Sequence, residues 1–150
     1  MRVVIQRVSR ASVHIQEIVH GEINKGLLIL LGITETDTTE DIEWLIGKIT
    51  KMRIFPDTDG KMNLSIKDVS GDLLVVSQFT LLANTKKGNR PSFIRSAHPD
   101  IAIPLYEQFL KIAELELNKP CASGKFGADM QISLINDGPV TITMDSKARE

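Results

Sequence analysis

Residues 77–81, SQFTL, place the polar side chains of Ser77, Gln78 and Thr80 at the end of an otherwise apolar run. Ends of strands that open into loops are favoured positions for chemistry, because a rigid element holds the side chains in place. Thr80 carries the hydroxyl of a nucleophile, but such a group needs an adjacent base, and the sequence offers none nearby. Two interpretations therefore stay open, a reactive segment and a strand end whose hydroxyls bond locally.

A second segment, NDGPVT at residues 136–141, stands between the strand-like runs QISLI and VTITM. Asp-Gly is a strong signal for a hairpin turn, because Gly adopts positive φ without steric cost. Pro139 removes a backbone donor where the next strand begins, which suits the first residue of a strand, an edge or a bulge. The local rules predict a hairpin turn with Pro139 at the first position of the last strand.

Other reactive side chains do not form recognisable sites. The three histidines, His14, His20 and His98, are scattered and lack the spacing of metal ligands or of a catalytic triad. The single cysteine, Cys121, excludes an internal disulfide and a cysteine-based zinc site. GKFGA, at residues 124–128, lacks the preceding strand and the spacing of a phosphate-binding loop.

The net charge of −1 conceals a local asymmetry. No Asp or Glu occurs from residue 73 to residue 99, whereas Lys86, Lys87, Arg90 and Arg95 all fall in this range. A basic loop of this kind, with Phe93 inside it, is either a solvated face or a groove that follows an RNA backbone. The charge asymmetry is compatible with local phosphate contact, but the spacing alone favours the solvated face, which is the usual role of a charge cluster.

The composition is that of an ordinary globular protein, with 42% hydrophobic and 25% charged residues in 150. We expect a single domain over residues 1–150, no membrane span, because no apolar run approaches ~20 residues, and a cytoplasmic location. Strands are predicted at RVVIQRV, SVHIQ, GLLILLGI, RIF, KMNLSI, DLLVVSQFTLL and the two runs around NDGP. GLLILLGI should be buried on both faces.

Two helices should pack against these strands. The first follows Asp37, which stands three residues before Glu40 in a pattern like a capping box. The second begins near Pro99 and ends near Asn118, and Pro104 is tolerable there only within the first turn. The predicted fold is α+β, a compact, mostly antiparallel, barrel-like sheet with two main helices packed outside.

Six segments together carry a resemblance to a known family. The chain closely resembles the D-aminoacyl-tRNA deacylases over nearly its full length, in the same order of motifs. The matching segments are MRVVIQRVSRASV, FPDTDGKMNLSI, SQFTLLA, KGNRPSF, GKFGADM and NDGPVTI. Neither principal motif, SQFTL or NDGPVT, departs from the family pattern.

The resemblance implies a homodimeric hydrolase without metal or organic cofactor. It would cleave the ester between a D-amino acid and the terminal ribose at the acceptor end of tRNA, and would also remove misplaced glycine. In the family the bond matching Gly138–Pro139 is cis, so that both carbonyl groups hold the α-amino group and Cα of the substrate in the active site of the other subunit. An L side chain would find no room there, whereas glycine would pass.

The resemblance also assigns residues. Gln78 and the backbone of Phe79 and Thr80 would supply donors to the oxyanion while the ribose 2′-hydroxyl assists a water, an alternative preferred to attack by Thr80 itself because no base is present. Other residues implied in substrate binding or in support of the motif are Ser77, Phe79, Met130, Gly138, Pro139, Arg7 and Asn136. The alternatives are an editing deacylase of the same fold for a mischarged L-amino acid and a non-catalytic nucleic-acid-binding module.

Overall fold

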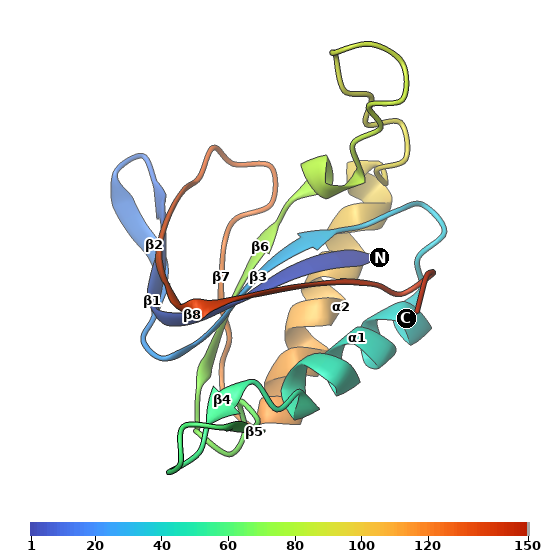
Figure 1. Cartoon of the computed structure of the whole chain (residues 1–150). Coiled ribbons are helices and arrows are strands. Elements are labelled where there is room, and N and C mark those ends of the chain that lie inside the picture. The colour runs from blue at the N-terminus through green and yellow to red at the C-terminus, as the bar shows by residue number, and fades with distance from the viewer. Residues whose placement is uncertain (150) are drawn as a thin grey trace.

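In the computed structural model, which describes residues 1–149, one long strand organises the sheet (Figure 1). This strand, β1 (Arg2–Ile15), pairs antiparallel with β3 (Gly26–Gly32) through its first half and with β2 (Ile18–Ile23) through its second half. Its other edge pairs along its length with β8 (Gln131–Asp145). The sheet order is β2-β1-β3-β6-β7, with β8 joined to β1.

The expectation of two short strands in place of β1 was wrong. The chain stays extended through Ser9–Ala11, where Arg10 lies opposite Ile135 and Ala11 opposite both Leu134 and Ile23. Arg10 pairs with β8, and Ala11 pairs with both β8 and β2, so the strand continues through this polar interruption. Local composition could not reveal that two distant strands would supply those partners.

The remaining strands extend the sheet in parallel. β6 (Asp72–Ser77) pairs parallel with β3, and the short β7 (Ala122–Ser123) pairs parallel with β6. A separate antiparallel ribbon consists of β4 (Phe55–Pro56) and β5 (Met62–Leu64). The antiparallel pairings outnumber these two parallel ones, and the predicted α+β fold with a mostly antiparallel, barrel-like sheet is confirmed.

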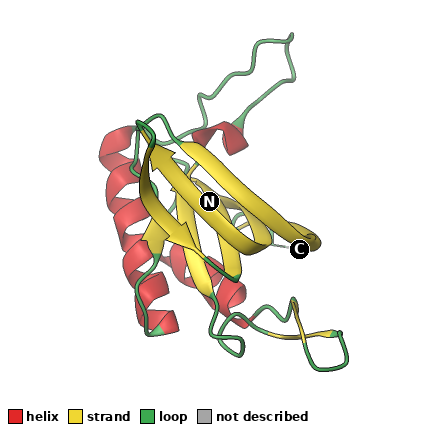
Figure 2. Ribbon diagram, turned by 90° about the vertical axis from the view of Figure 1, so that its left-hand side faces the viewer, coloured by secondary structure: helices red, strands yellow, loops and turns green. Residues whose placement is uncertain are grey.

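Two helices cover one face of the sheet (Figure 2). α1 (Thr39–Lys51) begins after Thr38, whose N–H donates to the side chain of Asp41 at 2.8 Å. The capping box is therefore closed by Asp41, and the predicted pairing of Asp37 with Glu40 was wrong. Asp37 instead accepts hydrogen bonds from the Thr34 N–H and from the α-amino group of Met1.

The second helix is α2 (Pro99–Leu117), and it ends at Asn118, which adopts φ 54°. The helix runs through Pro104, beyond its first turn, so the predicted restriction on this residue was wrong. Pro104 is exposed, and the backbone carbonyl that it leaves without a donor can therefore bind water. No helix of residues 1–149 is long and apolar enough to cross a membrane.

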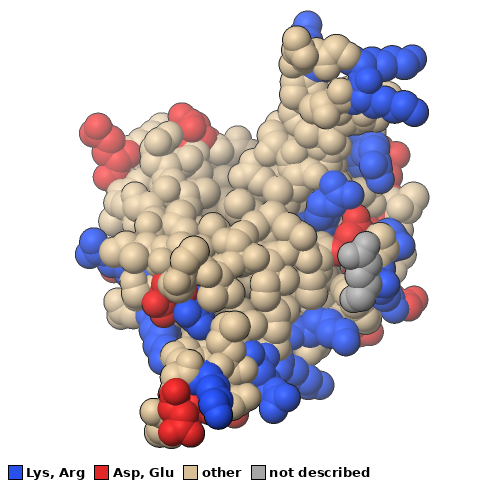
Figure 3. All heavy atoms as spheres, viewed as in Figure 1, with Lys and Arg blue, Asp and Glu red and all other residues tan. Residues whose placement is uncertain are grey.

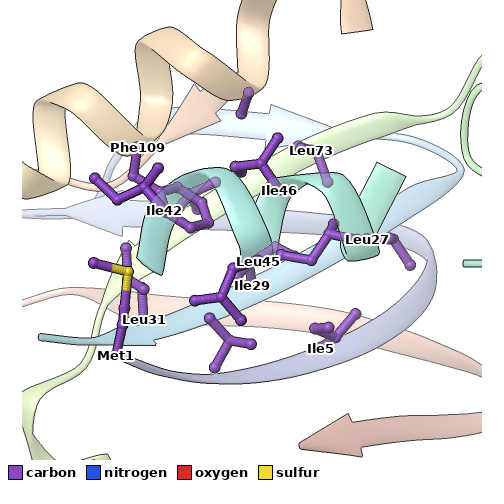
Figure 4. Close-up of a cluster of buried hydrophobic side chains, with 14 of the residues drawn as sticks. Met1, Ile5, Leu27, Ile29, Leu31, Ile42, Leu45, Ile46, Leu73 and Phe109 are labelled. Atoms are coloured by element: carbon purple, nitrogen blue, oxygen red, sulfur yellow. The ribbon is translucent and has the colours of Figure 1, made fainter. Parts of the chain in front are cut away.

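Side chains from both helices meet the sheet in the main core (Figure 4). β3 alternates between two clusters, with Leu27, Ile29 and Leu31 facing the helices and Leu28 facing the inside of the curved sheet. Both faces of β3 are therefore buried, as its continuous apolar sequence predicted. The smaller cluster inside the curve comprises Val8, Ala11, Val13, Ile23, Leu28, Leu74 and Val76.

Candidate active site

The SQFTL segment turns away from the sheet where β6 ends. Ser77 is the last residue of β6 to pair with β3, and the Gln78 N–H then donates to the Leu31 carbonyl oxygen at 2.7 Å. The chain continues as a 3₁₀ turn, η1 (Phe79–Leu82), so the predicted strand through Leu82 was wrong beyond Ser77. Gly32 permits this fold, because a Cβ there would lie 3.2 Å from the Gln78 carbonyl oxygen.

A cavity of about 290 Å³ opens where β6 ends. Its wall combines the polar end of β6 with apolar side chains from β3, α2 and the segment before β8. Such a mixture of an apolar wall with a few convergent polar groups is typical of a small-molecule site. The lining residues are Leu31, Ile33, Val76, Ser77, Gln78, Phe79, Ala97, Ala102, Phe126, Gly127, Ala128, Met130 and Ile132.

The lining carries no titratable side chain, all of its residues lying within the described part of the chain. Thr80 is exposed beside the cavity, and its hydroxyl oxygen accepts a hydrogen bond from the Gln78 side-chain amide. An amide cannot remove a proton from a hydroxyl group, and no acidic or basic side chain of residues 1–149 forms a hydrogen bond with the Thr80 hydroxyl. The geometry can supply neutral hydrogen-bond donors to a reacting group and cannot supply a proton acceptor.

Tyr106 of α2 braces the back of this wall. Its buried hydroxyl donates to the Val75 carbonyl oxygen at 2.8 Å and lies 3.3 Å from that of Gly124. Burial raises the pKa of Tyr106 to about 12, so the phenol stays protonated at neutral pH. The ring of Tyr106 also packs 6.0 Å from that of Phe126, which lines the cavity. Tyr106 therefore holds the wall in place as a protonated phenol.

The rim of the cavity is aromatic. Phe79 is 56% exposed, and its ring meets that of Phe93 edge to face with centroids 5.0 Å apart. The Ser96 hydroxyl donates to the Phe79 carbonyl oxygen at 3.2 Å, and Ala97 lines the cavity directly. The segment that follows the basic loop is thus attached to the cavity rim by side-chain contacts.

NDGPVT forms a bulge in a single strand, and the predicted hairpin turn was wrong. Val8 lies opposite Asn136 and Gln6 opposite Thr141, so residues 137–140 of β8 stand opposite Arg7 alone. Both sides of the bulge pair with the same strand, β1, and the chain direction does not reverse. Pro139 was expected at the first residue of a strand, at an edge or in a bulge, and the structure places it in a bulge. The Gly138–Pro139 peptide bond is cis.

Arg7 and Asn136 hold the bulge from inside. The buried Arg7 side chain donates from Nε to the Asp137 carbonyl oxygen at 2.8 Å and from Nη1 to the Ile54 carbonyl oxygen at 2.5 Å. Asn136 closes the base, because its Oδ1 accepts the Val140 N–H at 2.7 Å and its Nδ2 donates to the Val140 carbonyl oxygen at 3.2 Å. The bulge is therefore a fixed structure and not a loose loop.

Gly138 is required by this arrangement. Its φ is 140°, and a Cβ there would lie 2.8 Å from Cγ2 of Val140 and 2.9 Å from Nη2 of Arg7. Gly138 and Pro139 are nevertheless exposed on their outer side. They offer main-chain groups to solvent from a rigid support, which is a geometry suited to contact with another molecule.

The predicted site residues fall into two groups. Ser77, Gln78, Phe79 and Met130 line one cavity, with Thr80 beside it, whereas Gly138, Pro139, Arg7 and Asn136 form the bulge and line no part of that cavity. Within one chain the two motifs are therefore not united. Phe126, which lines the cavity, was not among the predicted site residues, although it lies in the matching segment GKFGADM.

The other candidates remain outside the site. No three His, Cys, Asp or Glu side chains among residues 1–149 gather closely enough to hold a metal ion. Cys121 is half-buried, and burial together with the nearby Glu114 raises the pKa of its thiol to about 12, which leaves it unreactive.

Comparisons with known proteins point to one family along the chain. The family model described as D-Tyr-tRNA(Tyr) deacylase matches residues 4–145. Proteins named D-aminoacyl-tRNA deacylase from Akkermansia muciniphila and Flavobacterium johnsoniae are 64% and 61% identical over 150 residues, which is 100% of this chain and of each relative.

Two solved structures share the fold. One, named c-Myc DNA Unwinding Element Binding Protein, has a TM-score of 0.91 at 40% identity and covers 99% of this chain and 100% of its own. The other, described as a probable eukaryotic D-amino acid tRNA deacylase, has a TM-score of 0.80 at 17% identity, covering 95% and 97%. The second likeness concerns the fold alone.

Proposed function

This chain belongs to the D-aminoacyl-tRNA deacylase family, and we propose that it hydrolyses the ester of D-aminoacyl-tRNA in the cavity at the end of β6. The observation that carries the assignment is the SQFTL segment, which lines an apolar cavity with polar groups and an exposed aromatic rim. The exposed ring of Phe79 suits stacking on the terminal adenine, since every base offers an apolar face. Met130 forms part of the wall behind the aminoacyl group.

Hydrolysis in this cavity proceeds by attack of water on the ester carbonyl, with the ribose 2′-hydroxyl assisting the water. The absence of a titratable group among the lining residues, all within the described chain, favours this route over attack by Thr80. Gln78 and the backbone N–H groups of Phe79 and Thr80 face the developing oxyanion. One well-placed donor of this kind lowers the barrier by roughly 2.7–4 kcal/mol.

The bulge selects the configuration of the substrate. Main-chain atoms of Gly138 and Pro139 hold the α-amino group and Cα, so that an L side chain meets the backbone and a D side chain points outward. Glycine has no β-carbon, and this filter accepts it as well. Support comes from the rigid hold of Arg7 and Asn136 on a bulge whose outer side is exposed. Selection by exclusion of the common substrate suits an editing enzyme.

Gly138 and Pro139 of one chain act at the cavity of a second copy of the chain, so the active unit is a homodimer. Gly138 and Pro139 do not line the cavity of their own chain. They lie on β8, whose edge away from β1 pairs with no strand of residues 1–149 and exposes Leu134 and Ile135 by 36% and 47%. An open edge strand with exposed apolar side chains is a favourable surface for pairing with another chain.

Hydrolysis of three charged tRNAs tests the function. Turnover of D-tyrosyl-tRNA and glycyl-tRNA, with L-tyrosyl-tRNA left intact, is the expected result. Turnover of the L substrate alone would instead indicate an editing deacylase for a mischarged L-amino acid. Binding without any turnover would indicate a nucleic-acid-binding module.

A mixing experiment tests the second copy. A variant with a disabled cavity, Gln78→Ala with Phe79→Ala, is co-expressed with Gly138→Val, which disables the filter. With random pairing, about half of the dimers are mixed, and each mixed dimer has one intact site out of two if the motifs act across subunits. The mixture should then regain about one quarter of wild-type activity. No recovery, or a fully active monomer in light scattering, would contradict the shared site.

A further inference from the structure

The basic loop at residues 84–95 projects from the body of the protein beyond η1 (Figure 1). Its base is closed by two backbone hydrogen bonds, from the Asn84 N–H to the Ser92 carbonyl oxygen at 2.8 Å and in the reverse direction at 2.9 Å. The Lys86 N–H donates to the Asn84 side chain at 2.9 Å, and Gly88 adopts φ 71° at the turn. The base of the loop is therefore ordered, and its tip is held away from the core.

The cations of this loop are exposed and lack acidic partners. Lys86, Lys87, Arg90 and Arg95 form no ion pair with any carboxylate of residues 1–149, whereas Arg2, Lys119 and Lys147 elsewhere in the chain are all paired. Figure 3 shows Lys and Arg side chains gathered on this projecting part, with no Asp or Glu among them. Four unpaired cations form a local positive field on a chain whose net charge is −1.

The loop is connected directly to the cavity. Phe93 packs on Phe79 at the rim, Ser96 donates to the Phe79 carbonyl oxygen, and Ala97 belongs to the wall. With about three residues on each side of its tip, the loop extends about 10 Å beyond its base. That reach corresponds to about three nucleotide steps along one strand, at about 3.4 Å each.

We infer that Lys86, Lys87 and Arg90 bind phosphates of the tRNA acceptor end about three nucleotides before the terminal adenosine, and so align the ester with the cavity. The inference rests on the proposed function, which places that adenosine against Phe79. The loop is a positioning element: it contacts the phosphate backbone, which is the same in all tRNAs, and does not contact the reacting atoms. Its contribution should therefore depend on salt and be independent of the base sequence.

The test compares two charge-matched triple variants. The loop variant carries Lys86→Gln, Lys87→Gln and Arg90→Gln. The control variant carries Arg53→Gln, Lys61→Gln and Lys111→Gln, three exposed cations that line no part of the cavity. Each protein is assayed on D-tyrosyl-tRNA and on D-tyrosyl-adenosine, which retains the ester and lacks every phosphate.

The loop variant should lose activity on D-tyrosyl-tRNA through KM, while its rate on D-tyrosyl-adenosine stays within about twofold of wild type, since that substrate has no counterions to release. Each phosphate contact on a single strand contributes about 0.7 to the slope of log affinity against log salt. Three contacts therefore make the wild-type kcat/KM fall about 20-fold more than that of the loop variant between 50 and 200 mM salt. The control variant should retain the wild-type salt slope.

An unchanged salt slope in the loop variant would overturn the inference, as would an equal loss on both substrates, which would place the effect in the cavity. Binding of uncharged tRNA, followed by fluorescence anisotropy over the same salt range, separates this inference from the proposed function. A wild-type protein that hydrolyses neither substrate refutes the function. Weaker, less salt-dependent tRNA binding by the loop variant would still support the phosphate contacts.

Discussion

Arg7 offers the sharpest test of how the bulge is held. Its guanidinium group is buried and donates to the carbonyl oxygens of Asp137 and Ile54, at 2.8 and 2.5 Å. A hydrogen bond from a charged group contributes about 1.5–3 kcal/mol to stability. Lysine cannot reproduce the planar fork, so Arg7→Lys should lose one of the two bonds and about 1.5–3 kcal/mol of the free energy of unfolding. Arg7→Ala should lose both, about 3–6 kcal/mol.

Two measurements test the effect of the Arg7 substitutions. Urea unfolding is monitored by the fluorescence of Trp44, the single tryptophan, which lies on α1. The ratio of kcat/KM for D-tyrosyl-tRNA to that for L-tyrosyl-tRNA is measured at a temperature where each variant is folded. Arg7→Lys should lower the ratio, because the bulge loses part of its support. The matched control is Arg10→Lys on the same strand, an exposed residue whose replacement should cost less than about 0.5 kcal/mol.

One result would rule out the proposed role of Arg7 as the support of the bulge. If Arg7→Lys unfolds at the urea concentration of the wild type and retains its discrimination between D and L substrates, the fork does not hold the bulge. A loss of stability with unchanged discrimination would limit Arg7 to a structural role and remove it from the support of the filter.

Three other changes have defined outcomes. Gly138→Ala places a Cβ at φ 140° against Val140 and should lower the free energy of unfolding by about 1–3 kcal/mol and slow deacylation of D-tyrosyl-tRNA; wild-type values in both assays would contradict the fit described. Thr80→Val should retain a near-normal deacylation rate in a single-turnover assay, whereas total loss in a folded protein would restore the nucleophile. Burial raises the pKa of Asp41, but the hydrogen bonds from Lys147, Ser146 and the Thr38 backbone, together with the charge of Lys147, outweigh burial and hold that pKa below its ordinary value. The carboxylate therefore stabilises the fold above about pH 4, and this contribution is lost as the pH falls further, so urea unfolding of Asp41→Asn should show a smaller decline between pH 5 and pH 2.

Residues with strong local preferences were predicted well. The run from Gly26 to Gly32 formed a strand buried on both faces, and the helix expected after Asp37 formed as α1, with Ile42, Leu45 and Ile46 buried against the sheet. These features depend on periodicity and on the burial of apolar surface, both of which are properties of a short segment. The family resemblance added the order of the motifs, and the comparisons confirmed the family.

Errors arose where distant segments supplied the deciding contacts. Ser9–Ala11 stayed extended because β2 and β8 pair with that part of β1, and SQFTL left the sheet because Ser77 is the last residue opposite β3. The cap of α1 closed on Asp41 because Asp37 bonds to the Met1 amine. In each case the local sequence allowed several outcomes, and a partner far along the chain selected one.

The sequence by itself determined the family, the main core elements and the identity of the two motifs, because these follow from residue type and spacing. Only the tertiary structure decided that NDGPVT is a bulge, since its form depends on Arg7, which is 130 residues away from the Asp137 carbonyl that it bonds. The tertiary structure also separated the bulge from the cavity within one chain. A turn signal describes a few dihedral angles, whereas the pairing of both sides of NDGPVT with one strand depends on how the whole sheet closes.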